Sequence, residues 1–385
     1  MGQDTLASEV SVKAHVTAQT FWIVVVALCA AIGVSFVHAQ GEQAPLWAYG
    51  FDTPAKPGEK AGPQAPPTRN LRPNEDPAEQ QRPQHVEGSS ATFTLVDIRD
   101  GHNVIDWFPG DHPPMPSVVK NGPASLMDQR GRGCGSCHLP NGKGRPENAP
   151  PAGQPAAYTL RQLHDFRNGL RFSSDRRKPN TATMVGLALA MSEKEMQEAA
   201  DYYAAMRWTP WIEVIETDRV PELELETGNM YIVKGKERTV PIAGRIIETP
   251  RDEHQANVLR NTRSGWIAYV PAGSLAKGEK LVTTGGVAVV NGKIAPGKTV
   301  AYGTCHGPDL MGLADVPGIA ARSPSYMMRQ LWDMKMGTRK GLSAQLMKQV
   351  VTNLTADDLT SIVAYLASVK VPAPATQSAS VKVTQ

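Results

Sequence analysis

The chain has 385 residues, and its 40 basic and 37 acidic side chains give a formal net charge of +3. This length accommodates two domains with additional tails, and the near balance of charge argues against binding to nucleic acid or to an anionic surface. The 34 glycines and 31 prolines indicate much loop and extended backbone beside the globular cores.

An N-terminal export segment is predicted over residues 1–39. An apolar run at 21–37 contains Cys29 and precedes a small-residue pattern, Val-His-Ala, at 37–39. This arrangement predicts a secretory signal peptide cleaved before Gln40, with an uncleaved membrane anchor as the alternative. Both alternatives export the rest of the chain, so we expect a periplasmic protein that contacts a membrane only if the segment remains attached.

A Pro-rich flexible arm is predicted at residues 40–90. Eight prolines fall between Thr53 and Gln84, with few apolar residues among them. Such a segment buries too little surface to offset its ordering entropy. The exception is PLWAYGF at 45–51, which is apolar enough to dock on a surface. A second flexible segment, the tail, is predicted at 373–385.

The exported part of the chain has three cysteines, Cys134, Cys137 and Cys305. Exported proteins usually pair their cysteines as disulfides, but three cannot all pair within one chain. Another use for these thiols is therefore expected.

A linker of strands and extended crossing segments is predicted at residues 212–272. Its segments are short, rich in β-branched residues and interrupted by proline, as in MYIVKG and GWIAYVPAG.

The segments on either side of this linker, 91–211 and 273–372, are repeats of each other. When the first is shifted by 168 residues, many identical residues coincide. The coinciding pairs include Gly135/Gly303, Cys137/Cys305, His138/His306, Pro140/Pro308, Gly144/Gly312, Tyr158/Tyr326, Arg161/Arg329, Gln162/Gln330, Leu163/Leu331, Asp165/Asp333, Gly169/Gly337 and Arg171/Arg339.

Farther along, the first copy is five residues longer in the stretch RFSSDRRKPN at 171–180, and the shift becomes 163 residues. Met184 then falls on Met347. Capping-box patterns start the last helix of each copy, with Ser192 and Glu195 in the first and Thr355 and Asp358 in the second. The fold class is therefore predicted to be mainly α, with two small all-α domains joined by the β/extended linker.

The first copy contains Cys134-Gly135-Ser136-Cys137-His138, a complete motif for covalent attachment of a c-type haem. Two thiols on one helical turn can reach the two vinyl groups of a haem, and the adjacent imidazole can reach its iron. A redox dithiol or half of a zinc site are the alternatives. The dithiol would require a βαβ context and the zinc site a second cysteine pair, and the sequence offers neither.

The second copy reads AYGTCH at 301–306, so Tyr302 replaces the first cysteine of the motif while Cys305 and His306 remain. We expect a second haem c attached through Cys305 alone. A degenerate site without haem is the alternative.

Methionine is the usual sixth ligand of a small electron-transfer haem. Only Met184 and Met347 coincide between the two copies, whereas the other methionines align with different residue types, as expected for core packing. The predicted iron ligands are therefore His138 with Met184 and His306 with Met347.

Other polar residues receive less specific predictions. His102, His112 and His164 are expected to be surface or packing residues. The repeated pairs Tyr158/Tyr326 and Arg161/Arg329 are expected either to bind haem propionates or the neighbouring domain, or simply to pack between helices.

The two repeats resemble class I cytochrome c domains, and the whole chain resembles exported di-haem cytochromes c. The resemblance covers roughly residues 91–372 and is carried by CHLPNGKGRPENAP, CHGPDLMGLADVPGIAARSPSYMMRQLWDM and LMKQVVTNLTADDLTSIVAYLAS, and in the linker by RIIETP and AYVPAGSLAKGEKLVTTGG. It implies short helices around each haem and a role in electron transfer, with Tyr302 as the departure from the family pattern.

The leading prediction is a non-enzymatic electron carrier, or the cytochrome subunit of an oxidoreductase. Its expected partners are a donor dehydrogenase and an acceptor cytochrome or oxidase. A di-haem peroxidase is the alternative from another class, although it would require an open iron position. A mono-haem docking module with a dead second site is the other alternative.

Overall fold

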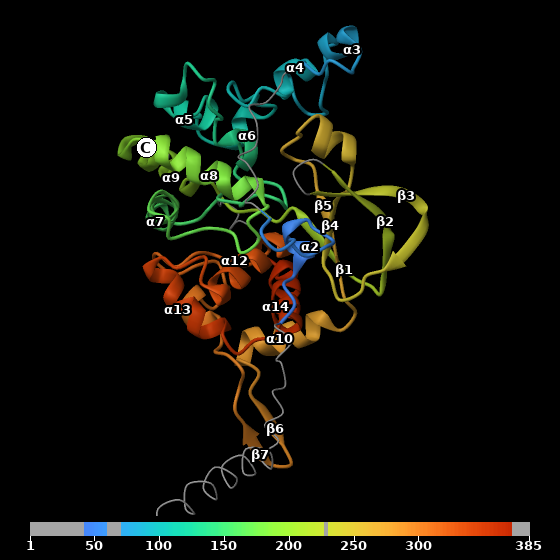
Figure 1. Cartoon of the computed structure of the whole chain (residues 1–385), viewed down its shortest axis with the longest axis vertical. Coiled ribbons are helices and arrows are strands. Elements are labelled where there is room, and N and C mark those ends of the chain that lie inside the picture. The colour runs from blue at the N-terminus through green and yellow to red at the C-terminus, as the bar shows by residue number, and fades with distance from the viewer. Residues whose placement is uncertain (1–41, 60–70, 227–229, 372–385) are drawn as a thin grey trace, which may run out of the picture. The chain divides into compact units, whose positions relative to one another are not determined.

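The computed structural model describes residues 42–59, 71–226 and 230–371 (Figure 1). The predicted export segment at 1–39 and the predicted tail at 373–385 lie outside these ranges. Within the described residues, no helix is long and apolar enough to cross a membrane.

The first repeat is helical. Its helices are α4 (Leu95–Ile98), α5 (Ser117–Lys120), α6 (Gly135–His138), α7 (Ala156–Arg167), α8 (Pro179–Ala190) and α9 (Glu193–Ala204), with short 3-10 turns at Pro109–Asp111 and Ala124–Leu126. The α9 helix begins at a capping box, in which Ser192 Oγ accepts from the Glu195 amide and the Glu195 carboxylate accepts from the Ser192 amide. The predicted start of this helix is confirmed.

The second repeat begins with α10 (Ser274–Thr284), which has no helical counterpart in the first. Its other helices, α11 (Gly303–His306), α12 (Pro324–Met336), α13 (Leu342–Val351) and α14 (Ala356–Ser368), correspond in order to α6, α7, α8 and α9. The α14 helix begins at the predicted capping box of Thr355 and Asp358. This half also contains an antiparallel hairpin of β6 (Ala288–Val290) and β7 (Lys293–Ala295), so it is not purely helical as the sequence analysis expected.

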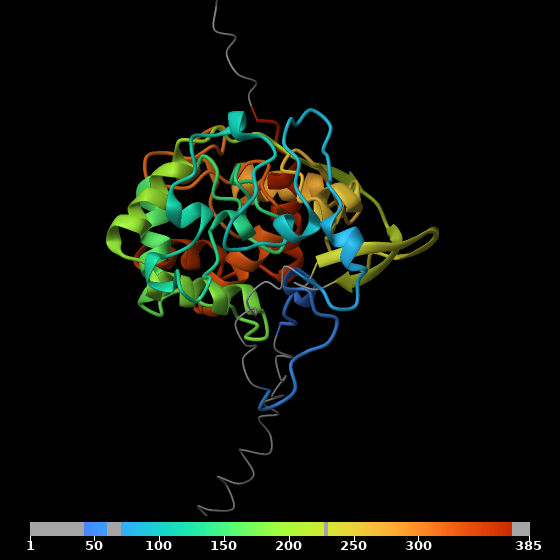
Figure 2. The same ribbon diagram turned by 90° about the horizontal axis from the view of Figure 1, so that it is seen from above.

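The segment between the repeats forms two small sheets. Its strands are β1 (Ile212–Glu216), β2 (Arg219–Glu226), β3 (Met230–Pro241), β4 (Ile247–Pro250) and β5 (Trp266–Val270), and a π-helical turn spans His254–Val258. In one sheet, β5 pairs in parallel with β1 and antiparallel with β4, while β2 and β3 form a separate antiparallel ribbon. The ribbon projects to one side of the helices in two perpendicular views (Figures 1 and 2).

The sheets pack against both helical halves. Trp266 and Met230 join the apolar core of the first half, whereas Ile246 and Val270 join that of the second. The segment therefore connects the two repeats and also contributes side chains to both of their cores.

The described parts of the arm, 42–59 and 71–90, contain two short helices. Helix α2 (Leu46–Tyr49) buries Trp47 and Tyr49 in the core of the second half, and Tyr49 Oη donates to Asp333 Oδ1 at 2.6 Å. Helix α3 (Pro77–Gln81) lies beside α4, and Arg99 forms an ion pair with Glu75 at 2.7 Å. Buried aromatic side chains and an ion pair thus hold these parts of the arm against the neighbouring helices.

The two halves contact each other in a nearly symmetric way. Gln154 exchanges two hydrogen bonds with the backbone of Gly318, each 2.9 Å long. Arg322, which coincides with Gln154 in the repeat, donates to the carbonyl of Pro150, the residue that coincides with Gly318, at 2.6 Å. Equivalent residues therefore meet equivalent loops, and the boundary follows an approximate two-fold relation.

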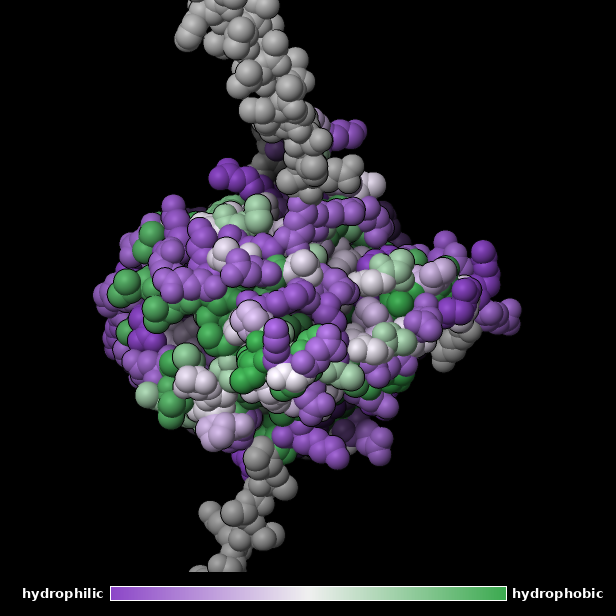
Figure 3. All heavy atoms as spheres, turned by 90° about the horizontal axis from the view of Figure 1, so that it is seen from below, coloured by the Kyte–Doolittle hydropathy of each residue, from purple (hydrophilic) through white to green (hydrophobic). Residues whose placement is uncertain are grey.

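Exposed apolar side chains lie mostly on the second half. Leu342 and Leu346 of α13 and Val289 and Ile294 of the hairpin are exposed. On the face seen from below, hydrophobic residues form separate patches among hydrophilic ones (Figure 3).

Candidate functional site

The attachment motif of the first repeat forms a single helical turn. The amides of Cys137 and His138 both donate to the carbonyl of Cys134, at 3.2 and 2.9 Å, so both thiols and the imidazole start from the same turn. No disulfide joins these two cysteines. Burial raises the pKa of Cys134 to about 12, which disfavours the thiolate that a reactive dithiol requires. Within the described ranges, no three His, Cys, Asp or Glu residues cluster as metal ligands.

The imidazole of His138 is held in one tautomer. Its Nδ1 lies 2.7 Å from the carbonyl oxygen of Ala149. Because a carbonyl can only accept, Nδ1 carries the hydrogen and Nε2 keeps its lone pair. Burial lowers the pKa of His138, which favours the neutral form. A neutral imidazole whose other nitrogen is anchored is the usual state of a metal ligand.

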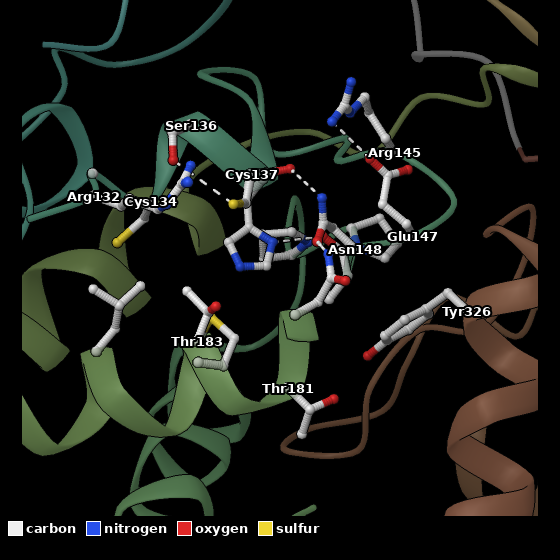
Figure 4. A pocket seen from close by; sticks show the side chains of 18 of the residues that line it. Arg132, Cys134, Ser136, Cys137, Arg145, Glu147, Asn148, Thr181, Thr183 and Tyr326 are labelled. Atoms are coloured by element: carbon white, nitrogen blue, oxygen red, sulfur yellow. Dashed lines mark hydrogen bonds and ion pairs between the residues drawn. The ribbon is translucent and has the colours of Figure 1, made fainter. Parts of the chain in front are cut away.

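A cavity of about 510 Å³ lies next to His138. Figure 4 shows α6 with Cys134 and Cys137 on one side of it, and α8 with Thr181 and Thr183 on the opposite side. Met184 follows Thr183 in α8 and also lines the cavity. The structure thus brings Cys134, Cys137, His138 and Met184 to one cavity, and the helices that carry them, α6 and α8, lie on opposite sides of it.

Part of the cavity wall comes from outside the first repeat. Tyr326 of α12 contributes from the second half (Figure 4), and so does Arg329 of the same helix. Arg260 contributes from the segment between the repeats, and its Nη1 donates to the carbonyl of Ser136 inside the attachment motif at 2.9 Å. Sequence reasoning missed Arg260, because no motif surrounds it. It did single out Tyr326 and Arg329, through their repetition.

The second repeat reproduces the backbone geometry of the first motif. The amides of Cys305 and His306 donate to the carbonyl of Tyr302 at 3.2 and 2.9 Å. His306 Nδ1 lies 2.8 Å from the carbonyl oxygen of Pro317, which is the same offset along the chain as from His138 to Ala149. Burial lowers the pKa of His306, so this imidazole too is neutral with Nε2 free of the anchoring bond.

The side chains around the second motif are packed differently. Tyr302 is buried in the core of the second half, and its ring lies nearly parallel to that of His306 with centroids 6.4 Å apart. Cys305 is exposed, whereas Met347 is half-buried and packs against the same core. The structure thus places Tyr302 beside His306 and packs Met347 against the apolar cluster that contains Tyr302.

The other singled-out polar residues act mainly in contacts between the repeats or in packing. Arg161 Nη1 donates to Asp315 across the boundary at 3.0 Å, and Arg329 donates to the carbonyls of Ala48 and Pro146. Tyr158 Oη accepts from Arg339 at 3.0 Å. The histidines bind locally: His102 contacts the carbonyl of Gly131, His112 contacts Asp106, and His164 contacts Glu193.

Comparison with known proteins connects this geometry to a family. No family model matches the chain. Cytochrome c-554(548) of Halomonas halodenitrificans is 35% identical over 65 residues, which are 17% of this chain and 78% of the relative. The chain belongs to the cytochromes c. Its di-haem character is supported by cytochrome c4 of Pseudomonas aeruginosa, which is 22% identical over 249 residues, a match that covers 64% of this chain and 88% of the relative. Cytochrome c4 of Stutzerimonas stutzeri is 36% identical over 93 residues, and there the chain spans less than half of the relative, 42%.

Solved structures similar to this cytochrome c include a reduced cytochrome c4 from Pseudomonas stutzeri. Its TM-score is 0.38 at 19% identity, and the match covers 62% of this chain and 93% of the other. A thiosulfate dehydrogenase from Marichromatium purpuratum has a TM-score of 0.39 and 20% identity, with coverage of 65% of this chain and 39% of the other.

The first site of this cytochrome fits a haem c. Its volume of about 510 Å³ lies within the roughly 300–1,000 Å³ of cofactor sites. A free Nε2, two thiols and a thioether supply the donors that a c-type haem requires. The lining also contains buried cations, among them Arg171, Lys178 and Arg329, which suit the carboxylates of such a cofactor.

Proposed function

We propose that this chain is a periplasmic di-haem cytochrome c that carries electrons one at a time from a donor dehydrogenase to an acceptor cytochrome or oxidase. The observation that carries the proposal is that His138 and Met184 line the same cavity from α6 and α8, the helices on its opposite sides. With His138 and Met184 both holding the iron, no open position would remain for a substrate, and the haem would supply only a change of oxidation state.

In this proposal, Cys134 and Cys137 tether the first haem, and His138 and Met184 hold its iron. Cys305 alone tethers the second, whose iron His306 and Met347 hold. The matching anchors of His138 and His306 support the second assignment, since both imidazoles keep Nε2 available. The domain boundaries that go with it are 91–211 and 273–372, with 212–272 between them.

Counting haems tests the proposal directly. Pyridine haemochrome analysis of protein matured in an export-competent host should give two haems per chain. Peptide mass spectrometry should place one on Cys134 and Cys137 and the other on Cys305. A bare Cys134–Cys137 pair would overturn the function as a whole, whereas one haem per chain would support the degenerate second site instead.

Two further measurements separate the carrier from its alternatives. The carrier should show no appreciable peroxide turnover, since a peroxidase requires an open iron position. Amino-terminal sequencing of the protein from a periplasmic extract should begin at Gln40 if the export segment is cleaved. Native co-purification would then identify the donor and acceptor.

A further inference from the structure

The stretch that makes the first repeat longer than the second buries a lysine. Lys178 precedes α8 and is only 2% exposed. Among the residues that the structure describes, none forms a hydrogen bond with its Nζ. On the shift of 163 residues it coincides with Gly341, so the second repeat has no counterpart. Lysine is almost never fully buried without a partner, because an unpaired charge loses its hydration.

The surroundings of Lys178 do not supply that partner. The side chain lines the first cavity, together with Arg329 from the second half and Glu147. Asp175 already pairs with Arg177 at 2.6 Å, and Glu147 pairs with Arg145 at 2.7 Å. Burial, reinforced by Arg329 and only partly opposed by the two carboxylates, lowers the pKa of Lys178 to about 7. This corner of the cavity therefore has a cation with an unused donor, while Asp175 is paired with Arg177 and Glu147 is paired with Arg145 through one of its two oxygens.

We propose that Lys178 is a carboxylate-binding residue of the first cavity and that it holds one propionate of the haem there. The inference rests on the proposed haem site at Cys134, Cys137 and His138. A propionate would supply the anion that the corner lacks, and the ammonium would in turn offset the negative charge next to the haem. Because a nearby positive charge disfavours the oxidised, more positive iron, Lys178 raises the reduction potential of the first haem.

The test compares holoprotein of Lys178→Gln with Arg176→Gln, which removes an exposed cation two residues earlier in the same stretch. The midpoint potential of each haem is measured by spectroelectrochemistry. Lys178→Gln should lower the ratio of reduced to oxidised first haem about tenfold at fixed potential, a shift of about 59 mV for one electron. In Lys178→Gln the potential of the second haem should equal its wild-type value, and in Arg176→Gln both potentials should. Lys178→Arg should keep the potential of the first haem close to wild type.

Resonance Raman spectroscopy identifies the ligand. The propionate bending band of the first haem should move in Lys178→Gln, and in the wild-type protein it should also move on exchange into D₂O, because the donor hydrogens exchange. The wild-type measurement remains decisive if the variant fails to mature. The alternative is that Lys178 binds a small anion from solution. In that case the potential of the first haem would change with the sulfate concentration at constant ionic strength while the propionate band stayed in place, and the proposal would be overturned.

Two other outcomes count against it. A Lys178→Gln holoprotein with unchanged potential and unchanged band would rule Lys178 out as a propionate ligand while leaving the electron carrier intact. If Glu147→Gln shifted the potential as much as Lys178→Gln and the propionate band stayed in place, the lysine would be paired with Glu147 instead. Failure of the proposed function is distinct, since it would appear as missing haem on Cys134 and Cys137.

Discussion

Arg171 and Arg339, equivalent residues of the two repeats, pair with each other as an isolated antiparallel bridge at the boundary between the halves. Their side chains share two acceptors that are also equivalent. Arg171 donates to Gln162 at 3.0 Å and to Gln330 at 2.7 Å, and Arg339 donates to Gln162 at 2.8 Å and to Gln330 at 3.2 Å. The approximate two-fold axis of the molecule therefore passes between these arginines.

Breaking this network should destabilise the folded protein. Arg339→Met removes the buried guanidinium and leaves the Gln162 and Tyr158 oxygens short of a donor, and hydrogen bonds to charged groups contribute about 1.5–3 kcal/mol each. We expect the free energy of unfolding to fall by about 2–4 kcal/mol, measured by equilibrium denaturation of the holoprotein.

The control for this prediction is Arg161→Met, which removes an exposed ion pair with Asp315 across the same boundary. Exposed pairs contribute about 0–1 kcal/mol, so this variant should stay close to wild type. Equal losses in the two variants would contradict a special role for the buried network.

Replacing the proposed sixth ligand should change the first haem. In Met184→Ala, the sulfur-to-iron charge-transfer band of that haem should disappear and its potential should fall, because the thioether favours the reduced iron. Met196→Leu is the control, since Met196 is fully buried in the core and coincides with Leu359 in the repeat. A band that survives in Met184→Ala would show that another residue binds the iron.

The tether of the second haem can be altered by one residue. The wild-type second haem should show a haemochrome peak red-shifted relative to a doubly tethered haem, because one vinyl group stays unsaturated. Tyr302→Cys should move the peak to the position of the first haem, and mass spectrometry should find both cysteines modified. Cys305→Ser should lose the covalent haem. A free Cys305 thiol in matured wild-type protein would refute the assignment.

Acid stability should depend on Asp358. Its carboxylate is buried at the start of α14 and pairs with Lys298 at 2.9 Å and Lys277 at 2.8 Å. Hydrogen bonds from these lysines and from Thr355 outweigh desolvation and hold the pKa of Asp358 well below its usual range. A depressed folded-state pKa stabilises the protein above the unfolded value of about 3.9, and this contribution is lost as the pH falls below it.

Asp358→Asn should therefore lower the free energy of unfolding at neutral pH by about 1–2 kcal/mol, the range for a lost helix cap. It should also flatten the loss of stability between about pH 5 and pH 2. Asp357→Asn, next to it but mostly exposed, should do neither. Thermal unfolding followed across this pH range checks both variants, and parallel curves for wild type and Asp358→Asn would contradict the prediction.

Local features of the sequence predicted much of the candidate site. The Cys-x-x-Cys-His turn, the near-motif at Tyr302 and both capping boxes depend on residues three or four apart, which a single helical turn brings together. The repeat singled out Met184 among the methionines, and the structure places it in the wall of the cavity with His138.

The rest of the site depended on contacts that no local pattern encodes. Sequence composition marked PLWAYGF at 45–51 as apolar enough to dock on a surface, but it did not predict that Tyr49 would be buried against Asp333. It also predicted a linker, but Arg260 from that segment binds the carbonyl of Ser136 in the attachment motif. These pairs lie far apart along the chain, so only the packed core determines which partners meet.

The sequence by itself thus predicted the covalent attachment and the iron ligands, because attachment motifs and repeat positions are local patterns of neighbouring residues. Only the tertiary structure decided what surrounds that chemistry. It buried Lys178 without a partner, placed Arg329 from the other half beside it and paired Arg171 with Arg339. Burial and charge pairing arise where distant segments pack together, and they set the electrostatic surroundings of the site.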